Sequence, residues 1–423
     1  MIETISPCSI YGKIKVPPSK SSMQRACAAA LITPGITIID NFGKSNDEKA
    51  AIEIITKLGA TINTVSNKMT ITSNDHIFHS PFPGKNIIVN CGESGLSMRM
   101  FAPIAALFNY DITFSGEGSI LKRPMNFFDE ILPKLNVDIN SNDGKLPITL
   151  RGPIHPKNIT VDGSMSSQFL TGLLFAFAKA CKAPVSIRVK DLSSKPYIDL
   201  TISVLNHFGF QIDNENYETF TLYPREPLPT YSIKYTVEGD WSNAAFLLVA
   251  GAIAGTITLT GADLDSSQGD KNIMQALYDC GAEVKIHQKE ITVRKNKLDA
   301  FNFDATHSPD LFPPLVALAS YCKGTSTVKG VNRLLFKESN RAISLKDEFK
   351  KMNVDVELDG DLMTIKGGKE LIGASVSSHN DHRIAMATAV AALSAKGNTT
   401  IHGADAVNKS YPDFFKDLKG FQV

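Results

Sequence analysis

One pattern recurs along the chain at a spacing of roughly 70 residues, and this internal repeat limits the fold more than any other feature. Each copy has an Ala- or Leu-rich apolar segment, a turn, and a short segment in which β-branched and polar residues alternate. The alternation is typical of a half-buried strand, and the apolar segment has the length of a helix. The six expected strands lie at 37–40, 112–115, 185–188, 257–260, 326–329 and 399–402.

Helices are expected before and after each of these strands. The first helices of the units lie at 23–31, 98–108, 169–178, 244–254, 311–321 and 384–395. The second helices lie at 48–58, 126–135, 198–208, 272–278 and 341–352, and the sixth unit is truncated after 413–418. Gly59, Gly209 and Gly281 follow three of the second helices, where the end of a helix favours glycine.

Six units in a chain of 423 residues are too many for one hydrophobic core and predict two domains of three units each. The Pro-rich segment 224–229 ends the third unit, and segments 2–5 and 14–16 have the pattern of strands that complete the second domain. We therefore expect an N-terminal lobe at 18–236 and a C-terminal lobe formed by 1–17 and 237–423. A hinge is expected near 17–18 and 230–238, where the chain crosses between the lobes.

The composition is that of an ordinary soluble globular protein, with 43% hydrophobic and 21% charged residues. The net charge of +1 provides no general basic field, so we expect neither nucleic acid nor a membrane as a partner. The N-terminus lacks the pattern of a signal peptide, and the apolar runs at 169–180 and 244–254 are too short to span a bilayer. The six dispersed cysteines, without a Cys-x-x-Cys pair, favour reduced thiols and a cytoplasmic location.

Charged and hydroxyl side chains gather where the expected helices begin. Lys20, Ser21 and Arg25 open the first helix, whose free N–H groups and positive dipole end attract anions. Similar groups stand at 92–99, 122–124, 163–168, 194–197, 239–243, 310, 337–341 and 379–383. Each motif alone is also typical of a surface capping sequence. Their agreement along the chain predicts that helix starts in each domain form an anion-binding face.

Other chemistries find less support in the sequence. His379 and His382 have the spacing of a metal pair on a helix, but no cluster supplies a third ligand. A capping role for one histidine, and orientation of the other by Asp381, is therefore favoured. Neither the Walker pattern nor Gly-x-Gly-x-x-Gly occurs, so nothing indicates nucleotide hydrolysis or dinucleotide binding.

Six motifs together resemble the EPSP synthase family of enolpyruvyl transferases. They are Pro18-Ser19-Lys20-Ser21 with Arg25, Ser166-Ser167-Gln168-Phe169, Ser194-Lys195-Pro196-Tyr197-Ile198-Asp199, Lys337-Glu338-Ser339 with Arg341, Asp381-His382-Arg383 with Ala385 and Met386, and Lys409-Ser410-Tyr411-Pro412-Asp413. The resemblance runs through essentially the whole chain in order. It implies a two-domain inside-out α/β barrel with three βαβαββ-type units per domain. It also implies transfer of the enolpyruvyl group of phosphoenolpyruvate to the 5-hydroxyl of shikimate 3-phosphate, in the shikimate pathway of aromatic amino acid biosynthesis.

The resemblance also implies which residues bind each substrate. For shikimate 3-phosphate it implies Lys20, Ser21, Arg25, Ser166, Ser167, Gln168, Ser194, Tyr197, Asp310 and Lys337. For phosphoenolpyruvate it implies Lys20, Gly95, Arg123, Gln168, Arg341, Arg383 and Lys409. Among the catalytic candidates, Asp310 is the base, Glu338 and Lys20 handle the proton at the phosphoenolpyruvate carbon, and His382 is a secondary candidate. No metal or organic cofactor is implied, and we expect a monomer.

The chain departs from the family pattern at two places. Glu93-Ser94-Gly95-Leu96 stands where the family usually has Asn-Ala-Gly-Thr, which leaves details of the phosphoenolpyruvate pocket and sensitivity to the inhibitor glyphosate open. Leu335 and Asn340 stand where an arginine and an aspartate are usual.

Two alternative functions are weighed against this one. The sister enzyme that acts on UDP-N-acetylglucosamine typically has an asparagine after the lysine and a reactive loop cysteine. Here Ser21 follows Lys20, and the loop at 116–118 has no cysteine. A non-catalytic sensor of a phosphorylated metabolite has no need of Asp310, Glu338 and Lys20, yet all three are present.

Overall fold

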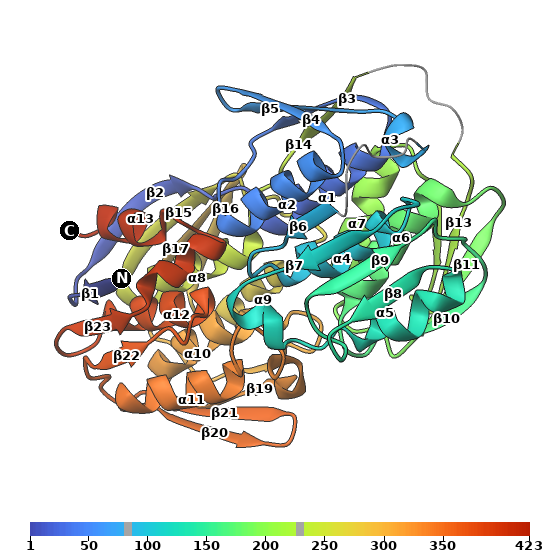
Figure 1. Cartoon of the computed structure of the whole chain (residues 1–423). Helices are drawn as coiled ribbons and strands as arrows, with labels where there is room; N and C mark the ends of the chain where they lie inside the picture. Colours follow the sequence, from blue (N-terminus) through green and yellow to red (C-terminus); the bar gives the residue numbers. More distant parts are fainter. Residues whose placement is uncertain (80–86, 226–231) are drawn as a thin grey trace. The chain divides into compact units, whose positions relative to one another are not determined.

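The computed structural model of the chain describes residues 1–79, 87–225 and 232–423 (Figure 1). Within them the chain forms two compact units, one of Pro18–Val237 and one of Met1–Pro17 with Glu238–Val423. Residues 230 and 231 of the expected crossing, and 226–229 of the Pro-rich segment, lie outside the described residues. The expected hinge stays a prediction.

The unit Pro18–Val237 contains three four-stranded sheets. In spatial order they are β14 (Ile233–Thr236), β3 (Gly35–Asp40), β5 (Lys68–Ser73) and β4 (Thr61–Val65); β6 (Ile87–Asn90), β7 (Ile112–Ser115), β9 (Ile148–Arg151) and β8 (Asp138–Ser141); and β10 (Ile159–Asp162), β11 (Val185–Lys190), β13 (Thr219–Leu222) and β12 (Ile212–Glu215). The helices are α1 (Lys20–Ile32), α2 (Asn46–Lys57), α3 (His76–His79), α4 (Gly95–Ala105), α5 (Asn126–Ile131), α6 (Ser167–Ala180) and α7 (Lys195–His207), with 3₁₀ turns η1 (Gly118–Lys122) and η2 (Pro133–Leu135).

The other unit contains two four-stranded sheets and one three-stranded sheet. They are β2 (Ile10–Lys15), β15 (Gly255–Thr260), β17 (Glu290–Arg294) and β16 (Glu283–His287); β18 (Asn302–Asp304), β19 (Gly324–Lys329), β21 (Leu362–Gly367) and β20 (Asp355–Asp359); and β1 (Ile2–Ile5), β23 (Thr399–His402) and β22 (Ser375–Ser377). The helices are α8 (Trp241–Ala254), α9 (Ile273–Asp279), α10 (Phe312–Tyr321), α11 (Arg341–Lys351), α12 (His382–Ala392) and α13 (Phe414–Gly420), with 3₁₀ turns η3 (Gly269–Asn272), η4 (Pro309–Leu311), η5 (Val331–Leu334) and η6 (Ala404–Lys409).

One strand topology is repeated in all six sheets. In each sheet one strand is parallel to one neighbour and antiparallel to the other, as β7 is to β6 and β9, and β23 is to β22 and β1. The N-terminal strands take part in this scheme, since β2 runs parallel to β15 and β1 runs antiparallel to β23. The six predicted strands are therefore confirmed as β3, β7, β11, β15, β19 and β23.

The first helix of each repeat lies in the core of its unit, and the sheets lie outside. Helices α1, α4 and α6 pack against one another, and so do α8, α10 and α12. Every residue of α4 and of α12 is buried, as expected for helices that are apolar on all sides. The strands keep one buried face, as the alternating burial along β5 illustrates. This inside-out α/β arrangement confirms the predicted fold class.

Three predicted helix ends are wrong. Helix α4 ends at Ala105 rather than at 108, and α12 ends at Ala392 rather than at 395. The helix predicted at 126–135 is divided into α5 and η2. Pro133 explains the division, because proline has no N–H to donate and its ring crowds the preceding turn.

Five of the six cysteines are buried and Cys8 is half-buried, and all six are free thiols. Within the described parts of the chain, no helix combines the length and the apolar character that crossing a membrane requires.

Close packing between α4 and α6 depends on Gly172, and this dependence is testable. A Cβ at this position would lie 2.6 Å from the carbonyl oxygen of Arg99 and 2.9 Å from that of Met100. Because both obstacles are backbone atoms, we expect Gly172→Ala to lower the free energy of unfolding by about 1–3 kcal/mol. Urea unfolding followed by circular dichroism measures this effect.

Gly420→Ala is the matched control, since nothing lies within 4 Å of a Cβ at that position. We expect it to change the stability by less than about 0.5 kcal/mol. A Gly172→Ala variant as stable as this control would contradict the described packing of α4 on α6.

Candidate active site

The first candidate residues stand at the start of α1. Ser19 is the N-cap, and its hydroxyl oxygen accepts a hydrogen bond from the N–H of Ser22. Lys20 is therefore the first helical residue, and its Nζ lies 2.8 Å from Oδ2 of Asp47. Asp47 belongs to the first turn of α2, which begins with a complete capping box formed by Ser45 and Glu48. Two capped helix starts thus place a lysine and an aspartate together.

Gln24 connects the starts of α1, α2 and α4. Its buried amide nitrogen donates to the carbonyl of Asp47 and to the hydroxyls of Ser94 and Ser97, over 2.9–3.0 Å. Ser94 is also the N-cap of α4. Helix starts separated by about 70 residues in sequence are in this way fixed side by side, as the repeat predicts.

Arg25 is a buried cation whose hydrogen-bond partners are neutral. Its side chain donates to Oγ1 of Thr201 at 2.9 Å and to the carbonyls of Ser21 and Tyr197 at 2.9 and 3.3 Å. Burial lowers the pKa of Arg25 to about 10, so the guanidinium remains charged at neutral pH. No carboxylate of the described residues forms an ion pair with it. A buried cation without a counter-ion favours binding of an anion.

Gly95 lies beside two arginines and a glutamine. A Cβ on Gly95 would be 2.5 Å from a terminal nitrogen of Arg123, 3.3 Å from one of Arg99, and 3.6 Å from Oε1 of Gln168. Arg99 donates to this Gln168 oxygen at 3.0 Å. The N-terminus of α4 therefore presents bare backbone amides next to guanidinium groups, which suits a phosphate or carboxylate.

The serines predicted to bind a phosphate lie on two adjacent loops. Ser166 is the N-cap of α6, and Ser194 precedes α7 in the left-handed backbone region with φ of 55°. The loops meet because the hydroxyl and N–H of Ser193 both donate to the carbonyl of Gly163 at 3.1 Å. Ser166, Ser167 and Ser194 thus belong to neighbouring helix starts in one unit.

The second group of candidate residues lies in the other unit and centres on Arg341. This guanidinium is fully buried, and it contacts Asp381 at 2.9 Å, Asp310 at 2.7 Å and Glu338 at 2.5 Å. Burial alone would lower the pKa of Arg341, but the three carboxylates outweigh it and raise the pKa. Asp381 is itself fully buried and also caps α12.

Asp310 accepts hydrogen bonds from three cations. Lys337 and Arg341 donate to its Oδ1 at 3.0 and 2.7 Å, and Arg383 donates to its Oδ2 at 3.2 Å. Burial on its own would raise the pKa of the Asp310 carboxyl. Arg383, Lys337 and Arg341 outweigh burial and hold this pKa well below its usual value. In the absence of substrate, Asp310 is consequently a weak base.

The remaining candidates of this unit lie around the start of α12. His382 follows the N-cap Asp381 and is buried. Nζ of Lys409 donates to the carbonyl of Asn380 at 2.5 Å. His379 contacts Glu348 on α11. The described residues contain no group of three or more histidine, cysteine or acidic side chains that is able to hold a metal ion.

The predicted site residues thus form two groups, and each group is brought together within its own unit. Lys20, Ser21, Arg25, Gly95, Arg123, Ser166, Ser167, Gln168, Ser194 and Tyr197 belong to the unit Pro18–Val237. Asp310, Lys337, Glu338, Arg341, His382, Arg383 and Lys409 belong to the other unit.

Three of the residues that depart from the family pattern, Glu93, Leu96 and Asn340, have structural roles of their own. Oε2 of Glu93 accepts a hydrogen bond from the N–H of Ser119 at 3.1 Å, and Leu96 is buried. Asn340 is the N-cap of α11, where an aspartate would serve equally well. Leu335 is half-exposed, and its role has no explanation in the structure.

Three residues of these groups were not among the predicted site residues, although the motifs at 92–99 and 379–383 include two of them. Arg99, Asp47 and Asp381 all contact predicted site residues. Arg99 stands one helical turn after Gly95, so its side chain shares a helix face with it, and this spacing was available as a signal. The contacts of Asp47 with Lys20 and of Asp381 with Arg341 join the beginnings of different helices, so they depend on how the helices pack.

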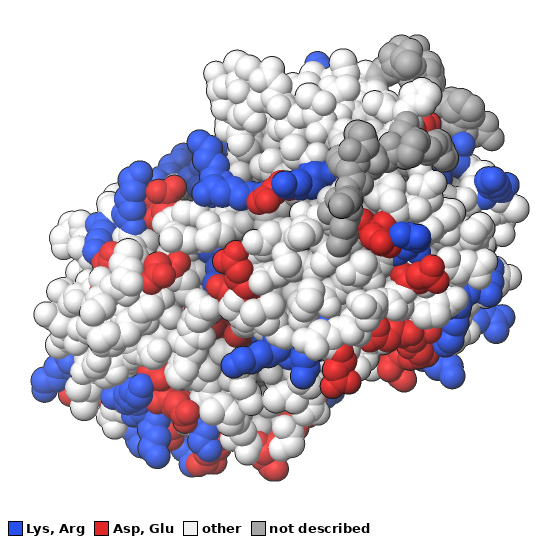
Figure 2. Space-filling view, in the orientation of Figure 1, with Lys and Arg blue, Asp and Glu red and all other residues white. Residues whose placement is uncertain are grey.

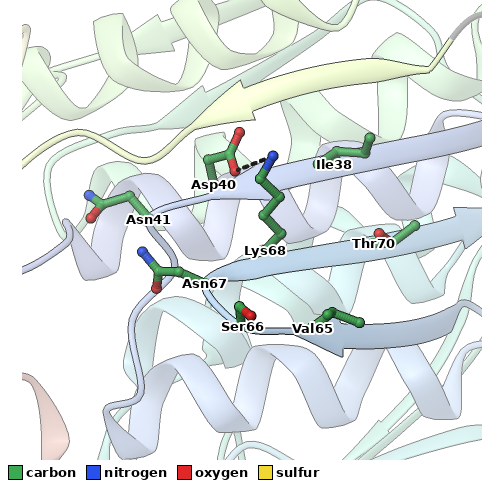
Figure 3. Close-up of a pocket in the computed structure, with 8 residues that line it drawn as sticks. All are labelled: Ile38, Asp40, Asn41, Val65, Ser66, Asn67, Lys68 and Thr70. Atoms are coloured by element: carbon green, nitrogen blue, oxygen red, sulfur yellow. Dashed lines mark ion pairs between the residues drawn. The ribbon is translucent and has the colours of Figure 1, made fainter.

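Other surface features do not overlap with the candidate residues. A hollow of about 640 Å³ lies over β3, β4 and β5, and it contains the 3.9 Å ion pair of Asp40 and Lys68 (Figure 3). A second hollow of about 480 Å³ lies over β10–β13 and includes Arg188 and Glu215. On the face shown in Figure 2, basic and acidic side chains are interspersed among wide uncharged areas. None of the predicted site residues lines either hollow.

Asp270 is a buried acid that the sequence did not single out. Its Oδ2 accepts a hydrogen bond from Ser242, while Oδ1 has no hydrogen-bond partner. Burial and the nearby negative charge of Asp310 raise the pKa of Asp270 to about 6, against an opposing effect of Arg383.

This raised pKa predicts how stability depends on pH. The carboxyl is ionised at lower pH in the unfolded chain than in the folded one, so its contribution to stability falls as pH rises from about 4 to 6. We expect Asp270→Asn, which does not ionise, to gain stability relative to the wild type over this interval. Urea unfolding of both proteins at pH 4.5 and 7.5 provides the comparison. Equal differences between the two proteins at both pH values would contradict the raised pKa.

Comparisons with known proteins agree with these features. The family model of EPSP synthase (3-phosphoshikimate 1-carboxyvinyltransferase) matches residues 5–418. The chain is 36% identical to a 3-phosphoshikimate 1-carboxyvinyltransferase of Clostridium kluyveri, over 98% of this chain and 96% of the relative. It is 35% identical to the protein of the same name from Methanocorpusculum labreanum, over 98% of this chain and 97% of the relative.

Solved structures show the same similarity. The EPSP synthase of Acinetobacter baumannii superposes with a TM-score of 0.83 at 25% identity, covering 100% of this chain and 98% of that structure. The enolpyruvyl transferase NikO of Streptomyces tendae shares the fold, with a TM-score of 0.75 at 17% identity over 99% and 97% of the two chains. The match to the family model over nearly the whole length and the identity to curated relatives lead to one conclusion. The chain belongs to the EPSP synthase family.

Proposed function

We propose that this protein transfers the enolpyruvyl group of phosphoenolpyruvate to the 5-hydroxyl of shikimate 3-phosphate, giving EPSP and phosphate in aromatic amino acid biosynthesis. The observation that carries the proposal is the family match over residues 5–418, which includes all the predicted site residues. The electrostatics of the two groups support it, because both substrates are phosphate- and carboxylate-bearing anions.

Shikimate 3-phosphate is assigned mainly to the unit Pro18–Val237. We assign its phosphate to Ser166, Ser167 and Ser194, and its ring to the neighbourhood of Tyr197. The adjacent helix starts of α6 and α7 support this assignment, since hydroxyl groups and N-terminal amides there suit a phosphate. Arg25 and Ser21 complete the set. Arg25 is buried among neutral oxygens and favours a charged ligand.

Phosphoenolpyruvate is assigned to residues of both units. Lys20, Gly95, Arg123 and Gln168 come from one unit, and Arg341, Arg383 and Lys409 come from the other. The lack of a side chain at Gly95 lets the guanidinium of Arg123 lie close to the first amides of α4. Arginine suits the planar carboxylate bidentately, and lysine acts as a compact charge and possible proton donor.

Asp310 is our proposed general base, and substrate binding activates it. Lys337, Arg341 and Arg383 all donate to Asp310, and all three are proposed substrate contacts. A substrate anion that takes over these cations removes the interactions that keep the pKa of Asp310 low. The pKa then rises toward the value that a general base needs.

The reaction proceeds by addition and elimination. The 5-hydroxyl oxygen adds to the central carbon of phosphoenolpyruvate, Asp310 takes the hydroxyl proton, and Lys20 or Glu338 delivers a proton to the methylene carbon. The resulting methyl group then loses a proton as the bond to phosphate breaks, which leaves the enolpyruvyl ether. His382 is a secondary proton carrier. The cations stabilise the negative charge of the tetrahedral adduct, so the proposal requires no cofactor.

We propose as well that the protein acts as a monomer in the cytoplasm. Both groups of site residues come from one chain, and dispersed cysteines suit reducing conditions.

Phosphate release tests the proposed reaction. We expect the protein to release phosphate when phosphoenolpyruvate and shikimate 3-phosphate are both supplied, and not when either is supplied alone.

Lys20→Ala should lower turnover at least about 100-fold, because both charge and proton transfer are lost. The exposed Lys44 lies outside both groups, so Lys44→Ala should keep normal turnover. Release from phosphoenolpyruvate alone would contradict the assignment, and near-normal turnover of Lys20→Ala would remove Lys20 from the mechanism.

We also propose that the two units close on substrate about the expected hinge near 17–18 and 230–238, of which residues 230 and 231 lie outside the described ones. Phosphoenolpyruvate contacts from both units support closure, because one small molecule has to reach all of them. Saturating shikimate 3-phosphate should lower the radius of gyration in solution X-ray scattering, whereas shikimate at the same concentration should not. An unchanged radius with bound shikimate 3-phosphate would argue against the hinge.

A further inference from the structure

The loop between β22 and α12 has an unfavourable backbone conformation. His379 and Asn380 are consecutive residues with φ of 52° and 55°, in the left-handed region; His and Asn adopt it more often than other residues with a Cβ, but usually as single residues. Two serines support the turn from within, since Ser377 Oγ accepts from the N–H of His379 and Ser378 Oγ accepts from that of Asn380, both at 3.1 Å. Such a conformation persists only where the surroundings determine it.

Glu348 on α11 supplies the support from outside the loop. Its side chain is only 1% exposed, and its carboxylate accepts from the N–H of Ser377 at 2.9 Å and contacts Nε2 of His379 at 2.7 Å. Nζ of Lys351 also donates to the two carboxylate oxygens of Glu348, at 2.9 and 2.7 Å. Burial alone would raise the pKa of the Glu348 carboxyl, but its hydrogen bonds with Lys351, Ser377 and His379 outweigh burial and lower the pKa.

The loop held in this way positions proposed phosphoenolpyruvate contacts on both of its sides. The carbonyl of Asn380 accepts from Lys409. Asp381, the next residue, binds the side chain of Arg341 and the N–H of Arg383. A change in φ at residue 379 or 380 therefore moves the partner of Lys409 and the carboxylate that fixes Arg341.

We propose that Glu348 is a positioning residue for phosphoenolpyruvate, which acts by fixing the 377–381 loop through Ser377 and His379. Glu348 itself touches no substrate in this role. The proposal rests on the proposed function, because the substrate assigned to Lys409, Arg341 and Arg383 comes from there.

Steady-state kinetics with each substrate varied in turn tests this role. Glu348→Ala removes both loop contacts, so we expect the KM for phosphoenolpyruvate to rise about tenfold, while the KM for shikimate 3-phosphate stays within about twofold. Glu348→Gln keeps an oxygen that accepts from Ser377, so most of the loss should be recovered. Lys351→Gln is the matched control, since it removes the exposed partner of the same carboxylate and leaves the loop contacts in place.

Kinetics of a His379 variant and hydrogen exchange at Ser377 test the same role independently. His379→Ala removes the contact between His379 and Glu348 by changing a partly exposed residue of the loop. This variant can replace Glu348→Ala in the test if Glu348→Ala does not fold. It should raise the KM for phosphoenolpyruvate about threefold, and less in a Glu348→Ala background, because the two residues act through one contact. Hydrogen exchange should be faster at the Ser377 amide of Glu348→Ala than in the wild type.

The positioning role is overturned if the KM for phosphoenolpyruvate stays within about twofold in Glu348→Ala, or in His379→Ala where the first variant does not fold. It is equally overturned if both KM values rise together. These outcomes differ from failure of the proposed function, in which the wild type itself releases no phosphate from the two substrates.

Discussion

The interaction on which the site depends is the pairing of buried cations with carboxylates of the same chain. Arg341 is fully buried and contacts Asp310, Glu338 and Asp381. Removing one partner of such a pair typically costs about 3–5 kcal/mol, because the other charge stays buried without compensation. The network therefore keeps the cations ionised and in place before any substrate arrives. In our proposal, Asp310 forms ion pairs with these cations until an anionic substrate takes its place. Because Asp310 then loses its cationic partners, its pKa rises and it becomes able to act as a base.

The fold creates this network by an unusual distribution of its elements. Because the first helices of the repeats are apolar along most of their length, their N-terminal ends carry the polar side chains and the backbone amides that no helical bond uses. Five of these six ends are capped by a side chain, as Ser19, Ser94 and Asp381 illustrate, and α10 is the exception. A cap pairs with only some of the N–H groups in the first turn, so the others are able to bind a ligand. The repeat provides several such helix starts in each unit. A repeated structural unit thus becomes a repeated anion-binding element.

Much of the fold could be predicted from the sequence because its signals are local. Alternating β-branched residues identified the strand of every repeat, and glycines such as Gly59 and Gly209 have the positive φ expected at the end of a helix. Helix ends were less predictable: the break at Pro133 has a local cause that the apolar pattern of 126–135 concealed, and nothing in the sequence pattern marked the early end of α4. The site motifs of Lys20, Arg341 and Asp381 were recognisable, whereas the pairing of Lys20 with Asp47 and of Arg341 with Asp381 was not. These pairs join residues 27 and 40 positions apart, and only the packing of helix starts determines them.

The central step of the proposed mechanism is the exchange at Asp310, whose cationic partners leave its carboxylate for a substrate anion. Carboxyl ¹³C NMR of the aspartates, assigned with Asp310→Asn and titrated with pH, measures the pKa of Asp310 directly. Without ligand this pKa should lie well below the usual value for an aspartate, and saturation with phosphoenolpyruvate, which is assigned to Arg341 and Arg383, should raise it. A pKa of Asp310 that stays low while phosphoenolpyruvate is bound would contradict this exchange.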